Sequence, residues 1–62
     1  MNNNLYEEFK KIYLAGTESF ALGKYFFDEN NILNIDILDK ETLEFRFFLK
    51  VKYDEKGEVI WY

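Results

Sequence analysis

Few side chains in this sequence could act as a nucleophile or a general base. Its 62 residues include no His and no Cys. The hydroxyl groups outside tyrosine belong to Thr17, Ser19 and Thr42, and no evident base stands beside any of them. Nucleophilic catalysis needs such a base within hydrogen-bonding reach. We therefore expect a protein that is not an enzyme and that needs no cofactor.

Two carboxylates are the other candidates for chemistry. Asp36 and Glu44 are expected to lie opposite each other on the sheet face away from the helix, and paired carboxylates can perform acid–base reactions. That work requires a cleft that desolvates one of them, and a sheet surface this small offers little concavity. Lys24 opposite Asp36 and Arg46 on the diagonal would neutralise the pair. A solvated ion cluster is the favoured interpretation.

Three further patterns are weaker. Residues 28–31, Asp-Glu-Asn-Asn, resemble the start of a calcium loop, but the Gly at its sixth position and the Glu at its twelfth are missing. A plain turn is favoured, and no metal site is expected. Gly16 and Gly23 form no phosphate-binding fingerprint. The lysines at 50, 52 and 56 near Phe48 and Tyr62 weakly resemble an aromatic–basic platform for nucleic acid.

The elements that must position these residues begin with a helix. Its apolar side chains follow helical spacing at Leu5, Phe9 and Ile12. Asn4 suits the N-cap, and Glu7 completes a capping-box pattern. Gly16 suits the left-handed residue that closes a helix. These signals predict a helix over residues 4–15.

A long strand follows near the other end of the chain. Between residues 43 and 53 every odd position is apolar: Leu43, Phe45, Phe47, Leu49, Val51 and Tyr53. Residues 54–57 form a turn in which Gly57 suits a positive φ. The return strand then covers residues 58–62. It places two pairs on one face: Tyr53 with Val59, and Val51 with Trp61.

A shorter strand is predicted over residues 33–37, which alternate between apolar and polar types. Residues 39–41 would turn it into the long strand. One register satisfies every apolar position. It pairs Ile37 with Leu43, Ile35 with Phe45, and Leu33 with Phe47.

Residues 17–27 allow two interpretations. Thr17 could cap a second helix, but the aromatic content and the turn residues at 28–31 favour a strand. A hairpin through residues 29–31 would pair Phe27 with Leu33 and Tyr25 with Ile35, and would set Lys24 facing Asp36.

The fold class that results is α+β, a single domain over residues 1–62. One N-terminal helix packs on a three- to four-stranded antiparallel meander in the order 1-2-3-4. The helix is expected to cover the face that carries Phe45, Phe47 and Trp61. Seven Phe, five Tyr and one Trp would build the core that disulfides or metals provide in other small domains.

The opposite face would then expose five large apolar side chains: Phe26, Ile32, Phe48, Ile60 and Tyr62. In the predicted register Ile32 lies opposite Phe48, with Tyr62 diagonal to it. The rim would consist of charged residues: Glu44, Arg46, Lys50, Lys52 and Glu58. Such a patch is typical of a protein interface. The alternatives are that the early segment or a chain end covers it, or that it forms a second minor cluster.

The net charge of the chain indicates which kinds of partner it could bind. Twelve acids against eight bases give a net charge of −4, which disfavours nucleic acid and favours a basic partner. No apolar run approaches the roughly 20 residues of a membrane helix. No signal-peptide pattern begins the sequence, so a cytoplasmic location without membrane association is expected.

These observations predict a small acidic protein-binding module. It would dock through the open sheet face, with Asp36, Glu44 and Arg46 as polar contacts, or through the edge strand at residues 58–62. The small size, the lack of a catalytic constellation and the lean towards residues with AT-rich codons would suit an inhibitor or accessory factor of phage or mobile-element type. The alternative is a homo-oligomer that pairs through the same patch.

Overall fold

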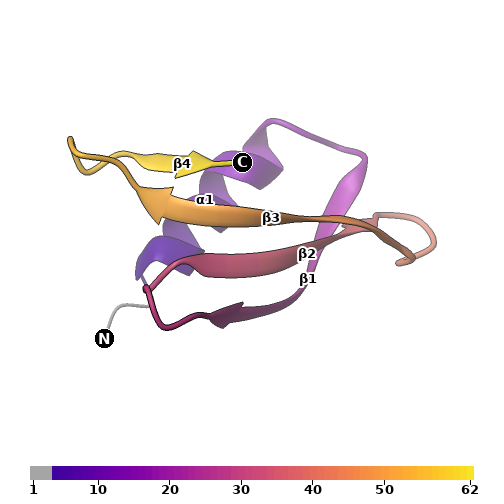
Figure 1. Cartoon of the computed structure of the whole chain (residues 1–62). Helices are drawn as coiled ribbons and strands as arrows, with labels where there is room; N and C mark the ends of the chain where they lie inside the picture. Colours follow the sequence, from indigo (N-terminus) through magenta and orange to yellow (C-terminus); the bar gives the residue numbers. More distant parts are fainter. Residues whose placement is uncertain (1–3) are drawn as a thin grey trace.

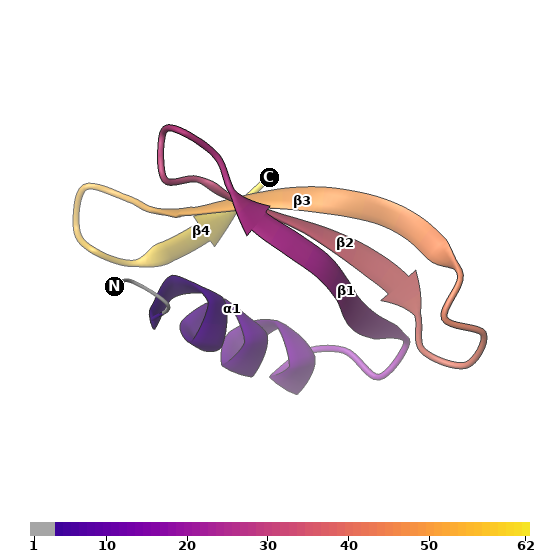
Figure 2. The same ribbon diagram turned by 90° about the horizontal axis from the view of Figure 1, so that it is seen from below.

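A computed structural model of the chain describes residues 4–62. It contains one helix and four strands: α1 (Asn4–Ala15), β1 (Phe20–Phe27), β2 (Leu33–Asp39), β3 (Phe45–Tyr53) and β4 (Val59–Trp61). The strands form one antiparallel sheet in the order β1-β2-β3-β4, and α1 lies across one face of it (Figures 1 and 2). This confirms the predicted fold, with a strand rather than a helix after residue 20.

Helix α1 has the predicted bounds but buries a different stripe. Leu5 and Phe9 are buried, whereas Ile12 is 48% exposed. Tyr13 takes its place because it stacks on Phe9, with ring centroids 5.0 Å apart, and packs edge-on against Trp61. The stripe therefore runs at a spacing of four residues throughout. The inclusion of Ile12 was wrong, since the sheet contact lies on the side of Tyr13.

The predicted helix ends also need correction. Asn4 is the first residue of α1 rather than its N-cap, and the preceding position lies outside the described residues. The backbone N–H of Gly16 donates to the Tyr13 carbonyl at 3.1 Å, so the last turn tightens without a left-handed residue. The glycine that does adopt a positive φ is Gly57, at 85°, as predicted for the turn before β4.

The two outer strand pairings agree with the sequence prediction. Strand β1 pairs Phe27 with Leu33 and Tyr25 with Ile35, and a bulge at residues 23–24 follows opposite Asp36. Strands β3 and β4 have the two predicted pairs, Tyr53 with Val59 and Val51 with Trp61.

The central pairing is shifted by four residues from the prediction. Leu33 lies opposite Val51, Ile35 opposite Leu49, and Ile37 opposite Phe47. The three-residue turn is replaced by a longer loop between β2 and β3. An even shift leaves the side chains of residues 47–53 on their expected faces, because successive residues of a strand alternate between faces.

Asp39 holds this longer loop in place. Its backbone N–H donates to the Glu44 carbonyl at 2.8 Å, and its own carbonyl accepts the N–H of Leu43 at 2.7 Å. Its carboxylate accepts the N–H groups of Glu41 and Thr42 at 2.9 and 3.1 Å. Leu43 adopts a left-handed φ of 64°, so it cannot begin the long strand as predicted.

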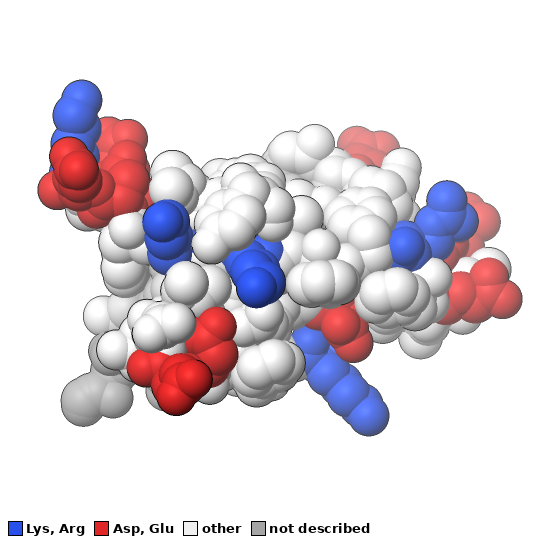
Figure 3. Space-filling model, viewed as in Figure 1, with Lys and Arg blue, Asp and Glu red and all other residues white. Residues whose placement is uncertain are grey.

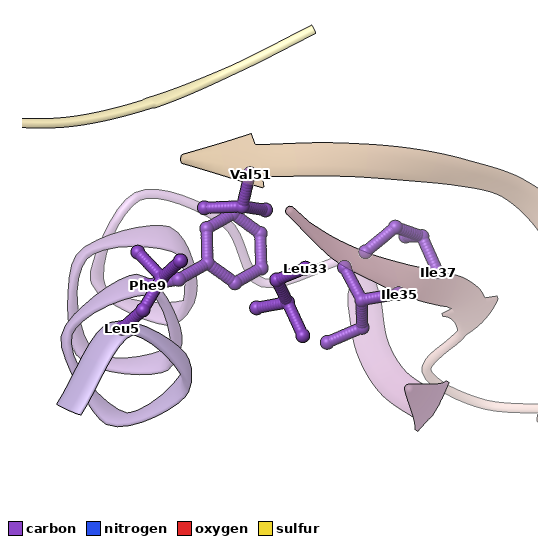
Figure 4. Packing of buried hydrophobic residues seen from close by; sticks show 6 residues of the cluster. All are labelled: Leu5, Phe9, Leu33, Ile35, Ile37 and Val51. Atoms are coloured by element: carbon purple, nitrogen blue, oxygen red, sulfur yellow. The ribbon is translucent and has the colours of Figure 1, made fainter. Parts of the chain in front are cut away.

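The core lies where the helix meets the middle of the sheet. Its buried members are Leu5, Phe9, Leu33, Ile35, Ile37 and Val51. Figure 4 shows the Phe9 ring between the helix and the side chains of β2 and β3. Phe9 also packs edge-on against Trp61, with centroids 5.2 Å apart. Tyr6 stacks on Tyr25 of β1, with ring centroids 4.0 Å apart. Helix α1 thus docks through Leu5 and three aromatic side chains, of which Phe9 is the most deeply buried.

The helix does not reach the far end of the β2–β3 hairpin (Figure 2). Phe47 is on the helix side, but it is 38% exposed and packs on Phe20 instead. A bulge then pairs Phe45 with Leu38, and paired residues project to the same side of a sheet. Phe45, 58% exposed, is therefore not covered by the helix as predicted.

Candidate functional site

The sheet face away from α1, here called the open face, has no element of residues 4–62 packed across it (Figures 1 and 2). Three aromatic side chains predicted for it are well exposed: Phe26 at 62%, Phe48 at 55% and Tyr62 at 60%. Ile60 is 37% exposed. The side-chain parity on which the predicted patch depends is therefore correct.

A row of neighbouring residues crosses all four strands on this face. Phe26 pairs with Asn34, and Asn34 pairs with Lys50. Lys50 and Tyr62 exchange two backbone hydrogen bonds of 3.0 and 3.1 Å, which continue the ladder beyond β4. Phe48 is two residues along β3 from Lys50, and so it lies diagonal to Tyr62 as predicted.

Next to this row is an open depression of about 460 Å³. Its lining includes Lys24, Phe26, Asn34, Asp36 and Phe48. The exposed rings of Phe26 and Phe48 frame the depression, and Lys24 and Asp36 lie at its side. Because it is bounded by a sheet surface rather than by enclosing walls, it suits a protruding side chain of a partner better than a small substrate.

Ile32 does not lie where the sequence placed it. It precedes β2, and the shifted register puts it level with Lys52 rather than Phe48. It is only partly exposed, and its backbone N–H donates to the Asp28 carboxylate at 3.1 Å. Ile32 therefore belongs to the margin of the open face.

The predicted cluster of carboxylates and Arg46 is not formed. Asp36 lies opposite Phe48, while Glu44 is in the β2–β3 loop. Arg46 forms an ion pair with Asp39, 3.7 Å between Nη1 and Oδ2, and not with the Asp36–Glu44 pair. The cause is again the shift of the central register, which moves the partners of residues 33–37 by four residues. No acid–base pair results.

Sequence reasoning underestimated the basic side chains of this face. Alternation along β3 puts Lys50 and Lys52 on the same side as Phe48, Arg46 stands at the bulge between Phe45 and Phe47, and Lys24 lines the depression. Lys50 was predicted for the rim but is half-buried in the middle of the transverse row. The sequence already indicated that these basic side chains share a face, because the bases of the long strand all occupy even positions.

Acidic residues hold the hairpins at the ends of the sheet. The Asp28 carboxylate accepts the N–H groups of Ile32 and Asn30, and these hydrogen bonds lower its pKa. The N–H groups of Thr42 and Glu41 lower the pKa of Asp39 in the same way. Residues 28–31 thus form a turn, as the sequence favoured over a calcium loop.

The third hairpin uses the same device. The Asp54 carboxylate accepts the N–H groups of Lys56 and Glu58, both at 2.8 Å.

Within residues 4–62 no group of three or more acidic side chains is arranged to hold a metal ion. In the same part of the chain, no helix combines the length and apolar character that crossing a membrane requires.

No protein-family model, curated protein or solved structure matches this chain. The exposed aromatic and basic residues of the open face are therefore the basis for a functional proposal.

Proposed function

We propose that this chain is a non-enzymatic binding module that docks on a partner protein through its open face. The observation that supports this is the exposure of Phe26, Phe48 and Tyr62 on one side of one sheet. Exposed apolar surface of this kind is costly in water and is typical of interaction sites. An inhibitor or an accessory factor would act in this way, by covering or holding a surface of a larger protein.

The composition of the face also suits a protein partner. Aromatic residues and arginine are enriched at protein interfaces, and Tyr62 and Arg46 provide both types. The molecule measures 34 × 23 × 20 Å along its principal axes. One face of such a molecule can supply the roughly 800 Å² that each partner buries in an ordinary interface.

Self-association through the same face is the alternative, and the charges oppose it. Lys24, Lys50 and Lys52 would meet their own copies or one another across a two-fold axis. Like charges brought together at an interface disfavour the complex. A partner of different sequence is therefore the better occupant.

Peptide selection combined with NMR tests the proposal. Binders selected from a random peptide display library should shift the amide signals of residues 26, 34, 48, 50 and 62. Phe48→Asp should weaken them by about tenfold or more, since loss of a central aromatic costs more than about 1.4 kcal/mol. Ile12→Asp makes the same charge change at an exposed site on the helix and should leave affinity within about twofold.

The folded state of both variants is checked first by circular dichroism. Binders that tolerate Phe48→Asp, or whose shifts map to the helix, would show that the open face is not the docking surface.

A further inference from the structure

The open face has a charge opposite in sign to that of the whole chain. Strands β1 to β3 carry four basic side chains, Lys24, Arg46, Lys50 and Lys52, against two acidic ones, Asp36 and Asp39. Arg46 and Asp39 form an ion pair, so the three lysines and Asp36 set the charge of the face. The chain as a whole has a net charge of −4. Figure 3 shows this face as a broad uncharged area containing separate basic groups, with most of the acidic groups toward its ends. The face is locally cationic.

The acidic side chains are concentrated in the three hairpins at the ends of the strands. They are Asp28, Glu29, Asp39, Glu41, Glu44, Asp54, Glu55 and Glu58. The aspartates among them are engaged with backbone N–H groups of their own turns. Asp39 and Asp54 are thereby held at the ends of the face, whereas the Asp28 carboxylate also accepts a hydrogen bond from the Asn34 side chain at 3.3 Å and so borders the transverse row.

Lys24 and Lys52 of the open face are exposed and available to an outside group, and Lys50 lies half-buried between them. Within residues 4–62 the ion pair joins Arg46 to Asp39, and Lys24, Lys50 and Lys52 have no carboxylate within 4.0 Å. Lys52 lies over the Tyr62 ring, with its ammonium 5.8 Å from the ring centroid. Cationic groups therefore alternate with exposed aromatic rings on the open face, and its lysines form no ion pair within residues 4–62.

Two polyanionic occupants can be compared on this basis. Aromatic rings interleaved with lysines suit single-stranded nucleic acid. A phosphate backbone that runs past the face, however, would meet the acidic hairpins at its ends, and repeated phosphate contacts dominate such binding. A compact acidic segment of a protein avoids these ends, and its apolar side chains can fill the depression between Phe26 and Phe48.

Building on the proposed function, we infer that the partner presents an acidic, apolar polypeptide segment to the open face. Its carboxylates pair with Lys24, Lys50 and Lys52, and its apolar side chains contact Phe26 and Phe48. Net charge alone favours a basic partner, but contacts within a few ångströms respond to local charge because salt screens the rest of the molecule.

Three probes test this inference by NMR titration of the labelled protein. The first is a short soluble peptide of Glu, Leu and Phe, the second is the same peptide with every Glu replaced by Lys, and the third is oligodeoxythymidylate. We expect the acidic peptide to shift the open-face amides and to bind about tenfold or more tightly than its Lys counterpart at low salt. Its affinity should fall as the Debye length shortens from about 10 Å to about 3 Å between 0.1 and 1 M salt.

A matched pair of variants separates local from global charge. Lys24→Gln with Lys52→Gln removes two exposed cations from the open face, and Lys10→Gln with Lys11→Gln removes two from the helix. Both variants have the same net charge. The first should weaken the acidic peptide about tenfold, and the second should change its affinity less than about twofold.

The outcomes distinguish this inference from the proposed function. If the Lys peptide binds the open face as well as the acidic one and Phe48→Asp abolishes both, the acidic partner is ruled out while docking on this face stands. Tighter binding of the oligonucleotide would assign the face to nucleic acid and would overturn both. Equal losses in the two lysine variants would show that net charge decides, which also contradicts the inference.

Discussion

At the residue scale, three aspartates determine how the chain turns. Asp28, Asp39 and Asp54 each stand at the end of a strand and accept backbone N–H groups of the following turn. A carboxylate that accepts two such hydrogen bonds removes donors that the sheet cannot satisfy. The turn after β2 contains no Gly, and Leu43 takes the left-handed position there, so Asp39 provides most of its local order.

The lowered pKa values of Asp28 and Asp39 predict acid sensitivity. Their folded-state values lie below the ordinary 3.8, so the stability they provide is complete above about that pH and is lost as the pH falls through the lowered values. Urea unfolding followed by circular dichroism between about pH 5 and pH 2 should show this decline. Asp28→Asn combined with Asp39→Asn should be less stable at neutral pH and should show a shallower decline.

Glu29→Gln is the control, because it removes a charge from the first turn without removing one of these hydrogen bonds. If the stability of the double variant fell as steeply with decreasing pH as that of the wild-type chain, the two aspartates would not be the source of the acid sensitivity.

At the element scale, the helix depends on a few aromatic contacts and the sheet on its pairings. Phe9 is fully buried and reaches Trp61, while Tyr6 stacks on Tyr25 and Tyr13 packs edge-on against Trp61. The sequence alone predicted the helix bounds, the strand parity and the outer pairings. It did not predict that Ile12 would lie outside the contact, since Ile12 and Tyr13 are almost equally compatible with helical spacing from Phe9.

Truncation of Phe9 and truncation of Ile12 should lower the free energy of unfolding by very different amounts. Phe9→Ala removes a fully buried ring and should lower the free energy of unfolding by about 3–5 kcal/mol. Ile12→Ala removes a half-exposed side chain and should lower it by about 1 kcal/mol or less. Trp61, the one tryptophan of the chain, reports on both in urea titrations. Equal losses would mean that the helix docks through another side of its surface.

At the scale of the whole molecule, charge is divided between the sheet and its ends. Lysines outnumber acids on the open face, whereas acids outnumber bases in the hairpins, so the net charge of −4 describes the whole chain but not the open face. Repulsion between the face lysines would keep two copies from pairing through their exposed aromatics. In the proposed complex the same lysines would pair with the carboxylates of an acidic segment.

Self-association should therefore depend on salt and on the face lysines. In sedimentation equilibrium, raising the salt from about 0.1 to 1 M should increase dimerisation, because the Debye length shortens to about 3 Å. Lys24→Gln with Lys52→Gln should dimerise more readily than the wild-type chain at low salt. Lys10→Gln with Lys11→Gln should not, and equal dimerisation of the two variants would contradict a specific role of the open face.

The sequence by itself determined the helix, the strands after residue 33 to within a few residues, and the side of the sheet that most of their side chains face. It left residues 17–27 open between helix and strand, and it misplaced Phe45. Those properties follow from local periodicity and from turn residues such as Gly57. Only the tertiary structure decided the pairing of β2 with β3. A shift by four residues preserves the apolar alternation, so the pattern could not distinguish the two registers, and the hydrogen bonds of Asp39 favoured the longer loop. This register separates Asp36 from Glu44, and it decides which residues lie next to one another on the open face.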